Sequence, residues 1–415
     1  MVVITMLMTI SCTSGKKMTK AEPPSMANEL QESVLLGNEN LMQNHLDVVK
    51  EKRIGLLTNP SGVNSNLQSS ADLFYLHKGI QLKALFAPEH GIRGAEYAGD
   101  NIKDQIDPHT NLPVYSLYGD HRKPTAEMIE GLDAIIVDIQ DIGVRGYTYI
   151  YTMAKVMEAA AEFDKEVIVL DRPNPIGGIR VEGNLVEEPF YSFVGLYPIP
   201  YRHGMTIGEL AKLFNKEFGI ECHLTVIPMK FWKREMLWGD TGLQWVPTSP
   251  HVPHWETVLF MSATGTFGEL RTLSEGVGYT SPFEIVGAPW IKAREFADAL
   301  NDLHLPGVIF RPLTFHPYYA SYEGQVCQGV QLHLTKPRQF DSYITGLHIM
   351  KTAMHLYPEH DLFANKHRLG MFNKVMGTDK IMKKLIRGMS VEDIAEDWQN
   401  ELNRFNEVRK QYLIY

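Results

Sequence analysis

The sequence predicts an α/β protein in which a domain with a mostly parallel β-sheet precedes a second, smaller α/β domain. The first observation is a set of apolar runs of four to six residues, rich in Ile, Val and Leu, at Ile54–Leu57, Leu82–Phe86, Ala134–Ile139 and Val167–Leu170. Runs this short are typical of buried parallel strands. Helix-compatible segments separate them, as in a layered α/β domain. With 415 residues, 44% of them apolar, the chain is large enough for more than one core.

The other elements follow from caps and periodicity. A helix is expected over Tyr151–Phe163, where apolar residues recur at helical spacing. Thr206 and Glu209 form a capping box, so a second domain is expected to begin near Met205, with domains at 41–204 and 205–415. The rest of the prediction is a strand over His223–Ile227, a loop-rich stretch from Pro228 to Pro289, and a final helix from Ser390 whose buried face includes Ile394, Trp398, Leu402 and Phe405.

Composition excludes several classes of function. The net charge is −9, from 40 basic and 49 acidic residues, and no Lys/Arg-rich run occurs, which argues against a nucleic-acid partner. The three cysteines form no CxxC pair, and the histidines show no metal-ligand spacing, so no disulfide framework and no metal are predicted. No GxGxxG follows the first strand, so a dinucleotide cofactor is not expected either.

The N-terminus resembles a bacterial lipoprotein signal. Residues 1–12 are mostly apolar and end at Cys12, which would carry the lipid, and the polar segment 13–40 would serve as a tether. We therefore expect an exported protein, periplasmic or anchored to the outer membrane, whose membrane contact is a lipid on Cys12. The alternative is a frayed apolar N-terminus, which would carry no lipid.

Polar motifs follow all four predicted strands of the first domain. Because the carboxyl ends of parallel strands line one edge of a sheet, where ligands bind, these motifs are expected to converge there. Turns and helix caps use the same residue types, which is the structural alternative. The motifs are TNPSG (58–62), APEHG (87–91), DIQDIG (138–143) and DRPNP (171–175).

Carboxyl groups at this edge are the candidate catalytic groups. Glu89 directly follows an apolar strand, and partial burial would raise its pKa as a general acid requires. The alternative for Glu89 is a helix-terminal residue or an ion-pair partner of Arg93. Glycoside hydrolysis commonly uses a second carboxyl group, for which Asp138 and Asp141 are the candidates.

The expected ligand carries a carboxylate or phosphate, because arginines gather at the strand ends of this acidic chain. Pairing with nearby aspartates is the alternative, and Tyr147 belongs either to a sugar-stacking surface or to the core. The predicted substrate-binding residues are Asn59, His90, Arg93, Gln140, Arg145, Tyr147, Arg172, Asn174, Glu182, Arg202 and His203. In the second domain, the glycines of Ser274–Gly278 indicate either structural turns or loops that approach a ligand closely.

The motifs together resemble the exo-β-N-acetylmuramidase family of peptidoglycan hexosaminidases (glycoside hydrolase family 171), formerly a domain of unknown function. The runs that carry the resemblance, between about Leu56 and Pro289, are TNPSG, APEHGIRG, LPVYSLYG, DIQDIGVRGYTYIYTM, DRPNPIGG, VEGN and YRHGMT. The resemblance implies a Rossmann-like domain joined to a smaller α/β domain, with the active site in the cleft between them, and no cofactor.

The implied activity is release of N-acetylmuramic acid (MurNAc) from the non-reducing end of small peptidoglycan saccharides such as MurNAc–GlcNAc. The glutamate that this family is thought to use falls on Glu89, and the lactyl carboxylate of MurNAc suits an arginine-rich edge. The chain departs from the family pattern at Val277, where an arginine is usual. This departure leaves open a muropeptide-binding lipoprotein without catalysis, and a third hypothesis is a metal-dependent hydrolase that uses His90 and the aspartates.

Overall fold

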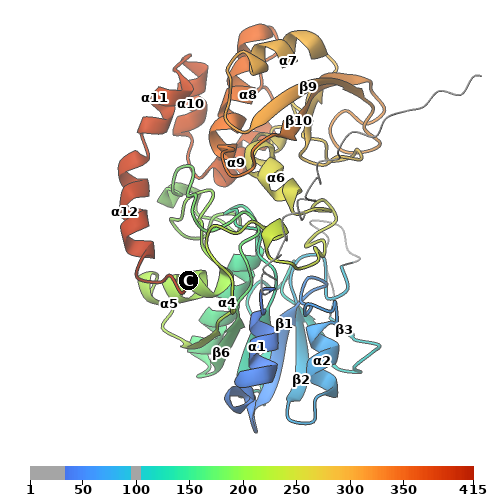
Figure 1. The fold of residues 1–415 in the computed structure, drawn as a ribbon, viewed down its shortest axis with the longest axis vertical. Helices are drawn as coiled ribbons and strands as arrows, with labels where there is room; N and C mark the ends of the chain where they lie inside the picture. Colours follow the sequence, from blue (N-terminus) through green and yellow to red (C-terminus); the bar gives the residue numbers. More distant parts are fainter. Residues whose placement is uncertain (1–32, 95–103) are drawn as a thin grey trace, which may run out of the picture. The chain divides into compact units, whose positions relative to one another are not determined.

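The computed structural model describes residues 33–94 and 104–415 (Figure 1). The predicted signal segment, Cys12 and most of the predicted tether lie outside the described residues. Within the described ranges, no helix has the length and apolar character needed to cross a membrane.

A seven-stranded sheet forms the first layer of the fold, in the order β3-β4-β2-β1-β5-β6-β7. Every pairing in it is parallel except that of β3 with β4. The strands are β1 (Arg53–Thr58), β2 (Gln81–Ala87), β3 (Gln105–Ile106), β4 (Pro113–Ser116), β5 (Ala134–Asp138), β6 (Glu166–Leu170) and β7 (His223–Ile227). The four apolar runs are thus confirmed as adjacent central strands, and with them the predicted fold class.

Both faces of this sheet are buried, which explains why its strands are continuously apolar. Alternate side chains enter two different cores: Ile136 of β5 joins the core under α1 and α2, whereas Ile135 and Val137 join the core under α4 and α5. The covering helices are α1 (Gly37–Asn44), α2 (Ser70–Leu76), α4 (Tyr149–Glu162) and α5 (Ile207–Glu217); α3 (Ala126–Ile129) precedes β5.

The predicted domain boundaries need two corrections. The capping box of Thr206 and Glu209 is confirmed, but it starts α5, which contacts β6 and β7, and β7 pairs with β6 in the first sheet. The sheet domain therefore extends past residue 205. The tether also ends earlier than residue 40, because α1 begins at Gly37, where a Cβ would lie 2.3 Å from the Asp171 amide nitrogen.

The second domain holds a three-stranded antiparallel sheet in the order β8-β10-β9. It contains β8 (Ile285–Ala288), β9 (Val308–Phe315), β10 (Cys327–Leu334), α6 (Glu256–Gly268), α7 (Ala293–Asn301), α8 (Ser342–Leu356), α9 (Lys366–Met376), α10 (Lys380–Ile386), α11 (Val391–Glu396) and α12 (Gln399–Arg409). Short 3₁₀ turns occur at Leu46–Val49, Glu188–Phe190 and Trp238–Asp240.

Two helices differ from the sequence prediction. Helix α6 lies inside the stretch predicted to be loops, and most of its residues are buried all around the helix, so it lacks the one-sided apolar pattern that marks a surface helix. The predicted final helix begins at the Ser390 cap as expected but divides into α11 and α12 near Trp398. Cys222 and Cys327 are free and buried, and burial raises the pKa of each thiol to about 11.

Candidate active site

Glu89 lies at the carboxyl end of β2, directly after the strand that the sequence predicted. Its side chain is half-buried, and its Oε2 accepts a hydrogen bond of 3.0 Å from the Thr148 hydroxyl at the start of α4. The next residue, His90, is buried with φ at +73°, a backbone conformation that is strained for a side chain of this size. The turn after β2 is therefore held in a specific shape around the carboxyl group.

Tyrosine hydroxyl groups surround this carboxyl group. Tyr118 follows β4, the neighbour of β2; burial and, to a smaller extent, the nearby Glu89 carboxylate raise the pKa of Tyr118 to about 12. Burial and, to a smaller extent, Glu89 also raise the pKa values of Tyr147 and Tyr149. All three phenols thus stay protonated at neutral pH and present hydroxyl groups rather than charges, which suits a neutral sugar ring.

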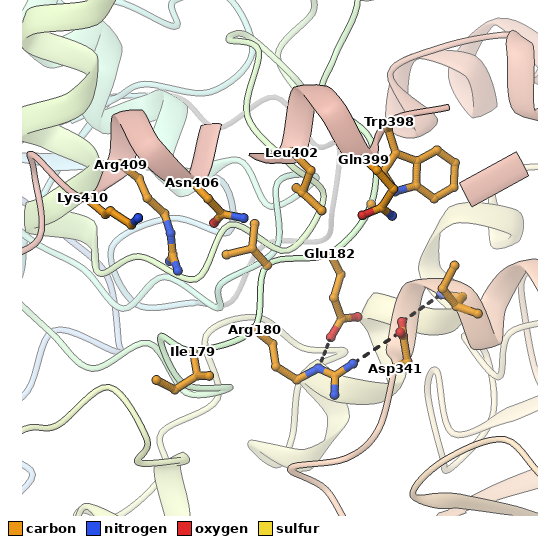
Figure 2. Close-up of a pocket in the computed structure, with 13 residues that line it drawn as sticks. Ile179, Arg180, Glu182, Asp341, Trp398, Gln399, Leu402, Asn406, Arg409 and Lys410 are labelled. Atoms are coloured by element: carbon orange, nitrogen blue, oxygen red, sulfur yellow. Dashed lines mark hydrogen bonds and ion pairs between the residues drawn. The ribbon is translucent and has the colours of Figure 1, made fainter. Parts of the chain in front are cut away.

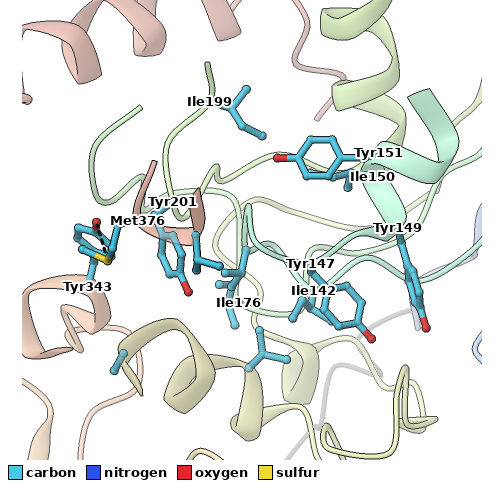
Figure 3. Close-up of a cluster of buried hydrophobic side chains, with 14 of the residues drawn as sticks. Ile142, Tyr147, Tyr149, Ile150, Tyr151, Ile176, Ile199, Tyr201, Tyr343 and Met376 are labelled. Carbon is cyan, nitrogen blue, oxygen red and sulfur yellow. Dashed lines mark hydrogen bonds between the residues drawn. The ribbon is translucent and has the colours of Figure 1, made fainter. Parts of the chain in front are cut away.

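A loop between the two domains closes one side of this cluster. The hydroxyl of Tyr147 donates to Thr248 Oγ1 (2.8 Å), and that of Tyr149 donates to the Thr248 carbonyl oxygen (2.5 Å). In Figure 3 these two hydroxyl groups point to the same side, whereas Tyr151 points elsewhere and belongs to the aromatic core. Tyr147 is itself buried, so it forms the base of the site and offers no exposed stacking face.

Asp138 is an internal group, in contrast to the catalytic role predicted for it. It has no exposed surface, and its Oδ1 accepts a 2.6 Å hydrogen bond from Arg172 Nε. Its Oδ2 accepts from Asn38 Nδ2 (3.2 Å) and from the Ser70 hydroxyl. Arg172 is equally enclosed and also donates to the Val63 carbonyl. The pair therefore connects strand ends to one another and is not placed to meet a substrate.

Asp141 and His203 form a second enclosed pair. His203 Nδ1 accepts from the Met205 amide (3.2 Å), so a neutral ring carries its proton on Nε2, which lies 3.3 Å from Asp141 Oδ2. The same oxygen accepts from the Gly143 amide at 2.7 Å. His203 is completely buried and Asp141 nearly so, which favours a role in shaping the turn after β5.

The other predicted arginines are structural as well, with one exception. Fully buried Arg145 donates to four carbonyl oxygens, two of them at the end of α9, where the helix dipole is negative. Arg202 pairs with Glu182 at 2.7 Å, and Glu182 also binds the Ser342 hydroxyl of α8, joining the two domains. Arg93 is the exposed one, and it forms ion pairs with Asp107 (2.8 Å) and Asp72 (3.7 Å).

The predicted amide side chains stabilise turns, as the structural alternative proposed. Asn59 Oδ1 accepts from the Ser61 amide (3.0 Å), Gln140 Nε2 donates to the Pro173 carbonyl (2.7 Å), and Asn174 Nδ2 donates to the Met205 carbonyl (3.0 Å). The sheet edge thus brings the predicted motifs together, but most of their side chains bind one another. Within the described ranges, no group of three or more His, Cys, Asp or Glu side chains is arranged to hold a metal ion.

A separate cavity of about 510 Å³ lies beside α12, between the segment 179–183 and the start of α8 (Figure 2). In it, Arg180 forms ion pairs with both Glu182 and Asp341. None of the residues grouped around Glu89 lines this cavity, so it is distinct from the candidate site.

Glu275 of the Ser274–Gly278 motif gives a pH-dependent prediction. Burial, with help from the charge of Glu269, raises its pKa to about 7, above that of an unfolded chain. The folded state then binds a proton more tightly than the unfolded chain does. The contribution of Glu275 to the free energy of unfolding is therefore fully present below pH 4.5 and is lost as the pH rises towards 7. Between pH 5 and 8, the free energy of unfolding measured in urea should fall by roughly 2 kcal/mol less in Glu275→Gln than in the wild type. The same change at exposed Glu396 should leave the pH profile as it is; identical profiles for both variants would contradict the prediction.

Two family models match adjacent parts of the chain. A family model described as Exo-beta-N-acetylmuramidase NamZ, N-terminal, matches residues 54–256, and the corresponding C-terminal model matches 259–415. The first match contains the sheet domain, including α5 and β7 but without α1. It also contains the residues grouped around Glu89. The division near residue 257 also fits the later boundary that the sheet requires.

Similar proteins cover almost the whole chain. The peptidoglycan beta-N-acetylmuramidase NamZ of Bacillus subtilis (strain 168) is 50% identical over 382 residues, which are 92% of this chain and 91% of that protein. Two crystal structures of DUF1343 family proteins from Bacteroides fragilis NCTC 9343 match with TM-scores of 0.88 and 0.74, at 43% and 29% identity. Each covers 92% of this chain and 99% of its own. The chain therefore belongs to the exo-β-N-acetylmuramidase NamZ family.

Proposed function

We propose that this protein is an exo-acting glycoside hydrolase that releases terminal MurNAc from the non-reducing end of peptidoglycan fragments such as MurNAc–GlcNAc. The observation that carries the proposal is the half-buried Glu89 carboxyl group at the sheet edge, which accepts a hydrogen bond from Thr148 and lies near Tyr118. Glycoside hydrolysis commonly uses a carboxylic acid beside the scissile bond, and Glu89 is a carboxyl group that is neither fully buried nor fully exposed.

In this mechanism Glu89 protonates the glycosidic oxygen as the bond to the leaving sugar breaks, and water supplies the hydroxyl group that C1 of the released MurNAc carries. The hydroxyl group of Thr148 fixes the orientation of the carboxyl group, so that its proton points along one direction. Because hydroxyl groups both donate and accept, they can serve Glu89 in its protonated and its ionised form. The site therefore holds the acid in place through the whole catalytic cycle.

The lactyl carboxylate requires a cation, and Arg145, Arg172 and Arg202 are committed to internal contacts. We assign this role to exposed Arg122, whose guanidinium lies 4.4 Å from the ring centre of Phe193 and 5.9 Å from that of Tyr118. The two aromatic rings hold the guanidinium next to Tyr118, one of the tyrosines whose pKa the Glu89 carboxylate affects. Its planar donors remain suited to a carboxylate.

Arg122→Ala should therefore weaken discrimination between the free lactyl acid and its methyl ester. The wild type should prefer MurNAc–GlcNAc to the ester about tenfold in kcat/KM, as a charge-assisted hydrogen bond gives, and the variant should treat them alike. Exposed Arg294→Ala on α7 is the matched control. An unchanged preference in Arg122→Ala would exclude this residue as the lactyl contact.

The experiment that tests the function compares two isomeric disaccharides. The protein is incubated with MurNAc–GlcNAc and, separately, with GlcNAc–MurNAc, and products are identified by mass spectrometry. The proposal requires free MurNAc and GlcNAc from the first substrate and no cleavage of the second. Saturable binding without cleavage would favour a muropeptide-binding protein, and loss of activity with EDTA would favour the metal-dependent hydrolase.

We also propose that the protein is exported and anchored through a lipid on Cys12. The support is the sequence of residues 1–12 and a substrate that is found in the cell wall. Labelling with radioactive palmitate in a bacterial host should mark the wild type and not Cys12→Ser. Equal labelling of the two, or none in either, would contradict the proposal.

A further inference from the structure

Two exposed tyrosines lie on the loop that joins β9 to β10 in the second domain. Tyr318 is 69% exposed and Tyr319 is 48% exposed, whereas the tyrosines around Glu89 are largely buried. The Tyr318 ring stacks on Tyr279 at 5.7 Å with 24° between the ring planes, and Tyr319 lies against His251. We call Tyr318 and Tyr319 the tyrosine platform.

The loop that carries the tyrosine platform is fixed in a strained conformation. Ala320 and Tyr322 have φ values of +64° and +63°, which are rare for residues other than glycine. The Tyr318 amide donates to the Gly278 carbonyl (2.8 Å), and a Cβ on Gly278 would lie 1.9 Å from the Tyr319 carbonyl oxygen. The Ser274–Gly278 motif therefore supports this loop through a close backbone contact. Strain kept in this way is commonly found at binding sites.

A short series of hydrogen bonds and chain segments connects the platform to Glu89. Glu89 binds Thr148, and the tyrosines on either side of Thr148 donate to Thr248. Three residues further along, His251 Nε2 forms a 2.7 Å hydrogen bond with the Tyr319 hydroxyl. Since three residues span at most about 10 Å, His251, which contacts the platform residue Tyr319, lies on the same loop region that contacts Tyr147 and Tyr149. His251 is also close enough to His90 for that ring to lower its pKa, an effect that adds to the larger one of burial.

We infer that the tyrosine platform binds the saccharide on the leaving-group side of the scissile bond, the GlcNAc of MurNAc–GlcNAc. This inference rests on the proposed function. An exo-acting enzyme must enclose the terminal sugar, which the buried tyrosines and Thr248 are placed to do. The leaving saccharide continues into solvent in longer fragments and needs an open surface. Exposed aromatic rings provide such a surface for the apolar face of a sugar.

The test compares a substrate that has a leaving sugar with one that lacks it. MurNAc–GlcNAc releases GlcNAc, whereas MurNAc β-fluoride releases only fluoride, so a contact with the leaving sugar affects the first substrate alone. Tyr319→Ala should lower kcat/KM for the disaccharide about tenfold and change it less than twofold for the fluoride. Tyr319→Phe, which keeps the ring and loses the bond to His251, should show a smaller loss, and Tyr318→Ala should resemble Tyr319→Ala.

The control is Tyr75→Ala, because Tyr75 is 45% exposed on α2 and belongs to no described site. Equal losses on both substrates in Tyr319→Ala, or no loss on either, would overturn the inference. Thermal unfolding of each variant should stay close to that of the wild type, since neither platform tyrosine is buried. If the wild type cleaves neither substrate, the proposed function fails instead, so the two failures can be told apart.

Discussion

Glu89→Gln is expected to lower kcat for MurNAc–GlcNAc by about 10³-fold, the scale of a lost general acid. Glutamine has the same shape, and the Thr148 hydroxyl can hydrogen bond to an amide as well as to a carboxylate. The fold and the affinity for the disaccharide should therefore persist. Release of MurNAc gives kcat, and calorimetry with the inactive variant gives the binding constant.

Thr148→Ser is the matched control for this prediction, because it keeps the hydroxyl group that contacts Glu89. Its kcat should stay within a few-fold of the wild type. A Glu89→Gln enzyme that retains a tenth or more of the wild-type kcat would show that another group protonates the leaving oxygen. Loss of binding together with turnover would instead assign Glu89 to substrate affinity.

Asp138→Asn is expected to lower the free energy of unfolding by about 3–5 kcal/mol, the cost of breaking a buried ion pair from one side. Asp138 and Arg172 are 0% and 2% exposed, so the substitution leaves the guanidinium buried without its counter-charge. Urea unfolding measures the loss. The fraction that remains folded should turn over MurNAc–GlcNAc within a few-fold of the wild-type rate.

Two further variants make the Asp138 prediction specific. Asp133→Asn breaks the exposed pair with Arg53 and should have a much smaller effect on stability. Adding Arg172→Met to Asp138→Asn should recover part of the lost stability, because the unpaired charge is then removed. If the Asp138→Asn protein is stable and its kcat is reduced as far as that of Glu89→Gln, Asp138 has a catalytic role and this prediction is wrong.

The sheet was predictable because its signal is local. Each central strand is an apolar run buried on both faces, and length alone separates such runs from helices. The boundary near Met205 was wrong because a capping box marks the start of a helix and does not indicate the domain to which that helix belongs. Helix α6 was missed because its apolar residues point in every direction, which removes the helical period.

The candidate site was predictable only in part. The rule that strand ends converge predicts the position of Glu89 just after β2, yet it cannot tell a side chain that faces a ligand from one that binds its neighbours. Arg145 illustrates the limit, since two of its partners are carbonyl groups about 230 positions along the chain. Tyr118 was within reach, because it follows another strand of the same sheet. Thr248 and His251 could not be predicted as part of the site, because they lie in a segment without a periodic pattern.

The role of Glu89 is tested most directly by the amount of free MurNAc that the protein and its Glu89→Gln variant release from MurNAc–GlcNAc. Both proteins are used at equal folded concentration, and mass spectrometry identifies the products. We expect MurNAc and GlcNAc in equal amounts from the wild type and a rate about 10³-fold lower from the variant. Equal release by the two proteins would contradict the central claim that Glu89 is the acid of an exo-β-N-acetylmuramidase.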